Sequence, residues 1–257
     1  MCDSRLVTLL VGAALLSGCA HYIPPSGRAD LSAITGSPET AATRPAEAGP
    51  TLQESFAARP AAGFPAGIAA VRLQAPRYRS YYTEHEGGVY GQGRYSVITV
   101  KEVEDEADFE RLSKLPDVGG LISISPLLLP QNLQDEKQLR EAAARLKADM
   151  LLIYTFETTF HDQDLAAPLS VVTLGLSPTR QLSVHVTVSA LLIDTRTGFI
   201  YAAFEANAKR HPLSDAFTSS LLADHARQSA EKAAFKSLVK EFENQWPAIV
   251  ERAHKGA

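Results

Sequence analysis

The chain has 257 residues, of which 45% are hydrophobic and 21% are charged, and its formal net charge is -4. This balance excludes a chain that is disordered along its whole length, a collagen-like fibre and a multi-span membrane protein. The weak negative charge gives no electrostatic reason to expect nucleic acid as a partner, and the length fits one domain or at most two.

The chain begins with an apolar run of eleven residues, Leu6–Leu16. It is too short to cross a bilayer, which takes about 20 apolar residues, and it has the length of the hydrophobic region of a secretion signal. The tetrapeptide Leu16-Ser17-Gly18-Cys19 ends this run. The alternative to a secretion signal is an ordinary apolar helix followed by a chance cysteine.

The tetrapeptide that ends at Cys19 resembles the lipobox of bacterial lipoproteins. In that family the cysteine is lipidated and becomes the first residue after the signal peptide has been removed. The resemblance implies a signal peptide over residues 1–18 and a membrane anchor at Cys19. Ala20 follows the cysteine where an aspartate would imply retention in the inner membrane, so the implied location is the periplasmic face of the outer membrane.

Residues 19–65 are predicted to form the lipidated cysteine and a disordered tether. Seven of the fifteen prolines lie between residues 20 and 65, with small residues around them, and such a stretch buries too little apolar surface to offset its ordering entropy. A flexible tether of this length has a root-mean-square reach of about 40 Å. A periplasmic domain is predicted over residues 66–257.

Hydrophobic periodicity and turn residues predict the elements of this domain. In chain order they are strands over 67–74 and 95–103, a helix over 105–115, a strand over 120–125, a helix over 134–148, strands over 150–160, 181–194 and 199–206, and a helix over 215–245. Asn132 is the expected cap of the second helix, and Trp246 is expected to close the last helix before Pro247.

These elements predict an α/β (α+β) domain built on a single mixed β-sheet. The strand, helix and strand between residues 120 and 160 have the spacing of a right-handed parallel crossover, a βαβ unit. The turn at Thr195–Gly198 joins the two strands of a C-terminal β-hairpin. The long C-terminal helix has an apolar stripe and is expected to pack on the sheet.

No catalytic constellation is found in the sequence, so we predict no catalytic residue, no metal and no cofactor. Ser229 and Lys232 match the S-x-x-K spacing of serine acylases, but the other motifs of those enzymes are missing. His85, His161 and His185 each lie near carboxylates or polar residues. Neighbouring side chains on a strand or loop point in different directions, so no such group forms a closed metal site by itself.

A cluster of tyrosines and arginines is the first candidate surface for a partner. Five of the eight tyrosines lie within residues 78–95, with arginines between them. This is the composition of interface hot spots, and aromatic faces also stack on sugars. A partner protein or cell-wall glycan is therefore one hypothesis, and tyrosines covering a sheet edge is the other. The candidate residues here are Arg77, Tyr78, Arg79, Tyr81, Tyr82 and Tyr90.

The second candidate surface is a stretch of fifteen residues without a charge, Leu165–Thr179. It is either a buried loop or short strand, or an exposed apolar flap that docks a partner or contacts lipid. The candidate contact residues are Leu169, Val171, Val172, Leu174 and Leu176.

Two segments carry a resemblance to known periplasmic domains. They are Ala144–Ile153, in which a helix runs into a strand, and Leu191–Gly198, which is similar to a hairpin motif with the pattern l-l-D-x-x-T-G. They resemble the α/β domains of the curli-secretion lipoprotein, the penicillin-binding-protein activator lipoproteins and the N-terminal domain of the Tol–Pal translocation protein. The resemblance implies a non-enzymatic module that works through protein–protein contacts.

The function predicted from the sequence is that of a membrane-anchored periplasmic lipoprotein. We expect it to act as a scaffold, activator or recruiting module of a cell-envelope complex, attached to the membrane through Cys19 and bound to an envelope protein. One alternative is a subunit of an oligomeric secretion assembly. Another is an envelope hydrolase whose site is assembled only in the fold.

Overall fold

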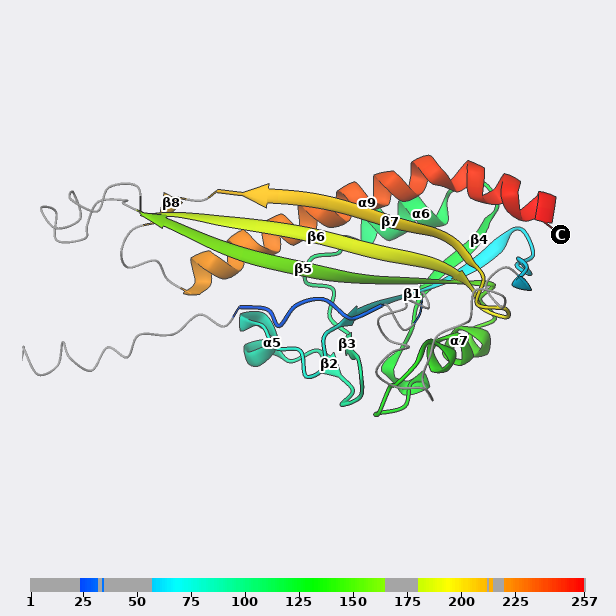
Figure 1. Ribbon diagram of the computed structural model, residues 1–257, viewed down its shortest axis with the longest axis horizontal. Coiled ribbons are helices and arrows are strands. Elements are labelled where there is room, and N and C mark those ends of the chain that lie inside the picture. Colours follow the sequence, from blue (N-terminus) through cyan, green and yellow to red (C-terminus); the bar gives the residue numbers. More distant parts are fainter. Residues whose placement is uncertain are drawn as a thin grey trace, which may run out of the picture.

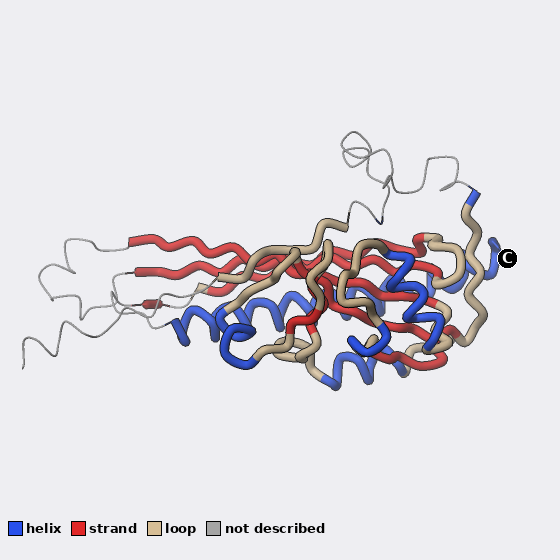
Figure 2. Tube along the Cα trace, turned by 90° about the horizontal axis from the view of Figure 1, so that it is seen from below, coloured by secondary structure: helices blue, strands red, loops and turns tan. Residues whose placement is uncertain are grey.

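The predicted fold class is confirmed by the computed structural model, which describes residues 24–31, 34, 57–164, 180–211, 213–214 and 220–256. Within these residues the strands form one mixed 8-stranded sheet with the path β2-β3-β1-β5-β6-β7, in which β4 also pairs with β1 and β8 with β6. The long C-terminal helix α9 covers one side of the sheet, and the smaller elements around α5 and α7 lie on the other side (Figures 1 and 2).

The elements have the following bounds. The strands are β1 Ala66–Gln74, β2 Val89–Tyr90, β3 Ser96–Ile98, β4 Val118–Ser123, β5 Met150–Asp164, β6 Arg180–Asp194, β7 Ile200–Arg210 and β8 Leu213–Ser214. The helices are α5 Tyr81–Glu86, α6 Glu106–Ser113, the 3₁₀ helix η1 Pro126–Leu128, α7 Glu136–Arg145 and α9 Ser220–Gly256.

The predicted parallel crossover is present in the structure. Strand β1 pairs in parallel with β4 and with β5, so the connection β4–α7–β5 passes over β1. Helix α7 does not begin at the predicted cap. Asp135 is its N-cap and accepts a hydrogen bond from the backbone N–H of Gln138, whereas Asn132 accepts one from the Gln134 side chain. The carboxylate of Asp135 is one residue from the first helical turn, which is the position a cap needs.

Strands β5 and β6 form a hairpin of two 15-residue strands that is paired from Met150↔Asp194 to Asp164↔Arg180. Strand β1 accompanies β5 only as far as the pair Val71↔Ile153. Beyond that pair the strands separate, and the side-chain amide of Gln74 accepts a hydrogen bond from Phe156 N and donates one to Phe156 O. The far half of the hairpin therefore continues beyond β1 as a ribbon with β7 (Figure 1).

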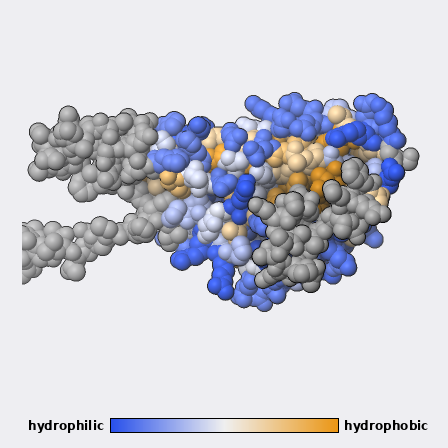
Figure 3. Space-filling model, in the orientation of Figure 1, coloured by the Kyte–Doolittle hydropathy of each residue, from blue (hydrophilic) through white to orange (hydrophobic). Residues whose placement is uncertain are grey.

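Helix α9 packs along the sheet through the apolar stripe that its sequence predicts. The side chains of this stripe are all buried, namely Ala230, Ala234, Leu238, Phe242 and Trp246. The helix does not end before Pro247 as predicted but continues to Gly256. Proline removes one backbone hydrogen bond, and the buried Ile249, Val250 and Ala253 beyond it keep the last turns on the domain. No described helix is long and apolar enough to cross a membrane. On the face of the molecule drawn in Figure 3, hydrophilic side chains line the rim of the described surface and apolar side chains lie toward its middle.

The alternation of side chains along β1 and β5 produces two cores, one on each face of the sheet. Ile68 and Phe156 belong to the core beneath α9 and α6, and Val71 and Ile153 belong to the core beneath α7. Strand β3 is shorter than the strand predicted over 95–103, because the chain leaves the sheet after Ile98.

Two stretches that the sequence places in the tether contact the folded domain. Near the N-terminus, Ala29 is 1% exposed and its N–H donates to Thr155 Oγ1 at 2.8 Å. Ahead of β1, Ala61 N donates to Asp194 Oδ2 at 2.7 Å, and the ring of Phe64 lies 6.3 Å from that of Trp246. The domain is thus larger at its N-terminal side than residues 66–257.

Candidate functional site

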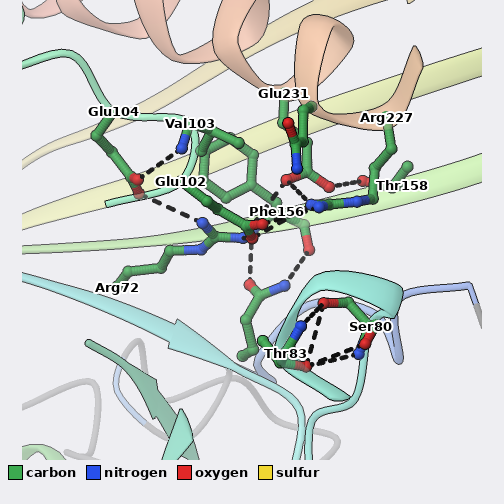
Figure 4. A network of polar contacts seen from close by, with 12 residues as sticks. Arg72, Ser80, Thr83, Glu102, Val103, Glu104, Phe156, Thr158, Arg227 and Glu231 are labelled. Atoms are coloured by element: carbon green, nitrogen blue, oxygen red, sulfur yellow. Dashed lines mark hydrogen bonds and ion pairs between the residues drawn. The ribbon is translucent and has the colours of Figure 1, made fainter. Parts of the chain in front are cut away.

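The most highly charged interior site of the described chain is a cluster that we call the buried charge cluster. It lies between α9 and side chains from β1 and β5, beside the segment that precedes α6 (Figure 4). Its members are Arg72, Glu102, Glu104, Asp224, Arg227 and Glu231, whose side chains are between 0% and 5% exposed.

The sequence builds this cluster from three separate segments. Asp224, Arg227 and Glu231 are spaced by three and four residues in α9 and therefore share one face of the helix. Arg72 is the single charged residue of β1 and points to the same side of the sheet as Ile68 and Ala70. Glu102 belongs to the segment between β3 and α6.

Arg227 makes the shortest ion pairs of the cluster. Its Nη2 lies 2.8 Å from Glu102 Oε2, its Nη1 lies 2.8 Å from Glu231 Oε2, and its Nε lies 2.8 Å from Asp224 Oδ1. All three guanidinium nitrogens of Arg227 thus donate to carboxylates. Because these contacts are charge-assisted and removed from water, they connect α9 to the segment before α6.

Arg72 holds the second position of the cluster with longer contacts. Its guanidinium nitrogens lie 3.5 Å from oxygens of Glu102, Glu104 and Glu231, and its guanidinium carbon lies 4.6 Å from the centre of the Phe156 ring. The Nε atom of Arg72 is buried without a hydrogen-bond partner. The arginine is therefore held by charge and by an aromatic face rather than by ideal hydrogen bonds.

Two strand side chains complete the polar contacts of the carboxylates. Tyr154 donates its hydroxyl to Glu104 Oε1 at 3.1 Å, and Thr158 donates its hydroxyl to Glu231 Oε1 at 2.8 Å. Burial raises the pKa of Glu231 above its usual range, although Arg227 and Arg72 act in the opposite direction. Burial, together with the nearby Glu104, also raises the pKa of Tyr154 well above its ordinary value.

The chemistry available to this cluster follows from its charge and burial. Two guanidinium groups face four carboxylates, so negative charge exceeds positive charge when all six groups are ionised. Side chains that are at most 5% exposed are closed to solvent in this conformation. The arrangement fits a structural role that fixes the position of α9 on the sheet.

Sequence analysis missed the buried charge cluster, because its members are far apart in the chain. Two local signals point to it in retrospect. Arg72 is the one charged residue in the strand sequence AAVRLQ, where a charge needs a buried partner. Arg227 has acidic residues one helical turn away on both sides, on a helix that was expected to pack on the sheet.

The tyrosine and arginine candidates are only partly at the surface. Tyr78 is 3% exposed and Tyr95 is fully buried, and burial raises the pKa of each hydroxyl to about 12. Tyr90 is half-buried and donates its hydroxyl to Leu129 O at 2.9 Å. Tyr78 is thus corrected from a surface ligand to a core residue, because the chain that follows β1 folds back over the sheet.

The rest of this cluster lies on or beside the short helix α5. Tyr81 and Tyr82 are half-buried and Arg77 is exposed. Tyr81 packs its ring 4.4 Å from that of His85. Arg79 is exposed, and its Nε lies 2.6 Å from Glu84 Oε1. These four candidates remain available for a partner, whereas the other candidate surface, with Leu169, Val171, Val172, Leu174 and Leu176, lies outside the described residues.

The other motifs of the sequence do not come together as sites. Ser229 accepts a hydrogen bond from Arg210, while Lys232 forms an ion pair with Asp105 at 2.6 Å. The His161 and His185 rings are 5.0 Å apart on the ribbon. Among the described residues no group of three or more histidine, cysteine or acidic side chains could hold a metal ion.

A surface groove lies between η1 and α7, away from the buried charge cluster. It encloses about 340 Å³ and is lined by apolar and charged side chains, namely Leu127, Leu128, Leu129, Pro130, Gln138, Glu141 and Arg145. Leu127 stands beside it with 94% of its surface exposed. An exposed leucine next to a groove of mixed polarity is a feature that a partner protein can cover.

The hairpin motif Leu191–Gly198 forms a tight turn that binds the chain ahead of β1. Asp194 Oδ1 accepts from the backbone N–H groups of Arg196 and Thr197, and its Oδ2 accepts from Ala61 N and from the Tyr201 hydroxyl. Burial alone would raise the pKa of Asp194, but these hydrogen bonds lower it below the ordinary value. The turn thus holds the residues that precede β1 against the domain.

Comparisons with known proteins give little about this chain. It matches no protein-family model and no curated protein. Among solved structures, one with partial similarity is the crystal structure of a candidate lipoprotein from Caulobacter crescentus, at 14% identity and a TM-score of 0.24. The match covers 38% of this chain and 64% of that one. At this TM-score the likeness supports no argument about the site.

Proposed function

We propose that the protein is an outer-membrane lipoprotein, acylated at Cys19, whose periplasmic domain is a non-enzymatic scaffold, activator or recruiting module of a cell-envelope complex. The observation that carries the proposal is the tetrapeptide Leu16-Ser17-Gly18-Cys19 at the end of an apolar run of signal-peptide length. The finer resemblance to the curli-secretion, activator-lipoprotein and Tol–Pal domains is part of the same proposal.

Two exposed regions support a binding role for the domain. One is the groove between η1 and α7 with the exposed Leu127 beside it. The other is α5, which carries the half-buried Tyr81 and Tyr82. Interface hot spots combine aromatic or aliphatic anchors with polar neighbours, and Arg79 and Arg145 supply those neighbours. Cell-wall glycan is a second ligand that tyrosine faces suit.

The anchor is tested by the mass of the N-terminal peptide of the protein isolated from cell envelopes. We expect cleavage before Cys19 and the added mass of acyl chains. The variant Cys19→Ala should remain unprocessed or leave the membrane fraction, and Cys2→Ala, which changes a cysteine inside the predicted signal peptide, should behave as the wild type. An unmodified Cys19 in the wild-type protein would refute the proposal.

The binding role is tested by photocrosslinking in intact cells. A photoreactive residue is placed at Leu127, at Tyr82 or, as a control, at Lys114, the C-cap of α6, whose side chain is 70% exposed. We expect a discrete crosslinked envelope protein from one of the first two positions and none from Lys114. Crosslinks that are equally diffuse at all three positions would contradict a defined binding surface.

One observation favours the alternative of an oligomeric assembly. Strand β7 has 11 residues and, within the described chain, pairs along one edge only, with β6. A long edge strand is a template for another chain. The mass of the detergent-extracted protein separates the two ideas, because a subunit of a ring would elute as a multimer at low concentration and a recruiting module would elute as a monomer.

A further inference from the structure

We propose that the end of the molecule formed by the tips of β5 and β6 and the start of α9 faces the phospholipid surface, held there by a very short linker. This inference rests on the proposed acylation of Cys19 and adds to it an orientation and a contact surface. It differs from the prediction of a long tether, under which the domain would work well away from its membrane.

The docked segment 24–31 has a defined direction along β5. Arg28 forms an antiparallel bridge with Gln74 at the end of β1, and its side chain lies 3.5 Å from Glu157 on β5. Ala29, one residue later, contacts Thr155. As the residue number falls in the segment it rises along β5, so the segment leads back toward the tip of the hairpin (Figure 1).

The segment is attached to the domain by hydrogen bonds and by buried side chains. Ser26 exchanges hydrogen bonds with Arg79, since its N–H and its hydroxyl both donate to Arg79 O and its Oγ accepts from Arg79 N at 2.8 Å. Ala29 is 1% exposed and Ile34 is 5% exposed, and both belong to the core beneath α7. The free linker from the anchor therefore ends at residue 24, and only the four residues 20–23 separate it from Cys19.

The residues between Cys19 and Pro24 can span only a short distance. Five extended residues, from Cys19 to Pro24, reach at most about 18 Å. Beyond Arg28, which contacts Glu157, the segment extends four residues to Pro24, or about 13 Å. Beyond Glu157, β5 extends seven residues to Asp164, or about 23 Å. Residue 24 thus stops about 10 Å short of the strand tip. The linker is long enough to pass the tip and too short to let the domain move far from the anchor.

The end of the molecule toward which the segment leads carries exposed apolar side chains. Helix α9 begins here with two exposed leucines, Leu221 at 55% and Leu222 at 47%. The C-terminus lies at the opposite end of the molecule (Figure 1). Apolar side chains beside a lipid anchor gain free energy by entering the headgroup region, which adds to the attachment supplied by the acyl chains.

The test uses the full-length protein, processed in cells and reconstituted in phosphatidylethanolamine/phosphatidylglycerol vesicles. Processing leaves no cysteine with a free thiol, because Cys2 lies in the signal peptide and Cys19 carries the acyl groups. Leu222→Cys or His211→Cys at the proposed lipid-facing end, and Lys255→Cys near the C-terminus, are labelled with an environment-sensitive fluorophore. Lipids with nitroxide headgroups then quench any label that lies at the membrane.

We expect quenching to be several-fold stronger at residues 222 and 211 than at residue 255. A flexible spacer of about 20 residues inserted between Ile23 and Pro24 should abolish most of this difference, because it removes the length restriction. Equal quenching at both ends, stronger quenching at residue 255 or a spacer without effect would overturn the inference. These results are interpreted after the mass of the anchor peptide is known, since an unacylated Cys19 refutes the proposed function, whereas an acylated one with equal quenching refutes the orientation alone.

Discussion

Replacing Arg227 by methionine tests whether the buried charge cluster stabilises the domain. The side chain is fully buried and has three carboxylates at 2.8 Å. In Arg227→Met, Glu102 and Glu231 keep Arg72 as a cationic neighbour at 3.5 Å, whereas Asp224 loses the guanidinium that it faces. Removing one partner of a buried ion pair costs about 3–5 kcal/mol. For a domain of this size the midpoint of thermal unfolding should fall by about 6–20 °C.

The assay is thermal and urea unfolding followed by the fluorescence of Trp246, the single tryptophan of the chain. Trp246 is 1% exposed and stacks on Phe242 at 5.4 Å, so its emission reports the packing of α9. The matched control is Arg111→Met, which removes ion pairs with Glu243 at 2.6 Å and with Asp108 at 3.5 Å. Because the arginine side chain is 45% exposed, the loss should be less than about 1 kcal/mol.

The comparison of these two variants decides the matter. If Arg227→Met is destabilised no more than Arg111→Met, then the buried ion pairs contribute no more than surface pairs and the reasoning is refuted. The double variant Arg227→Met/Glu231→Gln should recover part of the loss, because it removes one of the uncompensated negative charges. The coupling between the two positions then gives the energy of that pair alone.

Three further variants test other features of the structure. Burial raises the pKa of Glu231, so the folded state binds the proton of this carboxyl more tightly than the unfolded state does. The free energy of unfolding therefore falls as the pH rises above the ordinary carboxyl pKa of 4.5. Urea unfolding between pH 5 and 8 should show a smaller fall for Glu231→Gln than for the wild type. Gly93→Ala places a Cβ atom 2.0 Å from the backbone oxygen of Leu133, and calorimetry should show a loss of about 1–3 kcal/mol, while Gly63→Ala, with open space around it, should show none. The pKa of Asp194 is lowered in the folded protein, so its stabilisation is present above the unfolded pKa and is lost as the pH falls through the folded value; Asp194→Asn should cost about 1–3 kcal/mol at pH 7 and flatten the acid limb of the stability profile.

Much of the sheet could be predicted because its strands carry their own patterns. The regular alternation in β6 places Val184, Val186 and Val188 in the core beneath α9, as expected. The last four residues of β5 were missed because residues 161–164 are polar, and they extend the strand only by pairing with β6. Helix α5 has six residues and too little apolar periodicity to be distinguished from a loop.

The sites were harder to predict than the elements, because they depend on which segments meet. Nothing near Glu102 in the sequence announces that two arginines, one from β1 and one from α9, will reach it. Tyr78 and Tyr82 lie in the same tyrosine- and arginine-rich stretch of sequence. In the structure Tyr78 is buried, whereas Tyr82 is half-buried. Composition identifies a candidate surface, and only the path of the chain decides which of its residues face solvent.

If Cys19 carries the proposed acyl chains, the docking of residues 24–31 affects how the domain is released from a membrane. A protease that cuts the chain between residues 35 and 56 then separates the acylated piece from the rest only in the covalent sense. The piece stays attached through Ser26, Arg28 and Ala29, so two fragments that run apart on a denaturing gel would still sediment together with vesicles. Release into solution would need a second event, the dissociation of residues 24–31 from β1 and β5.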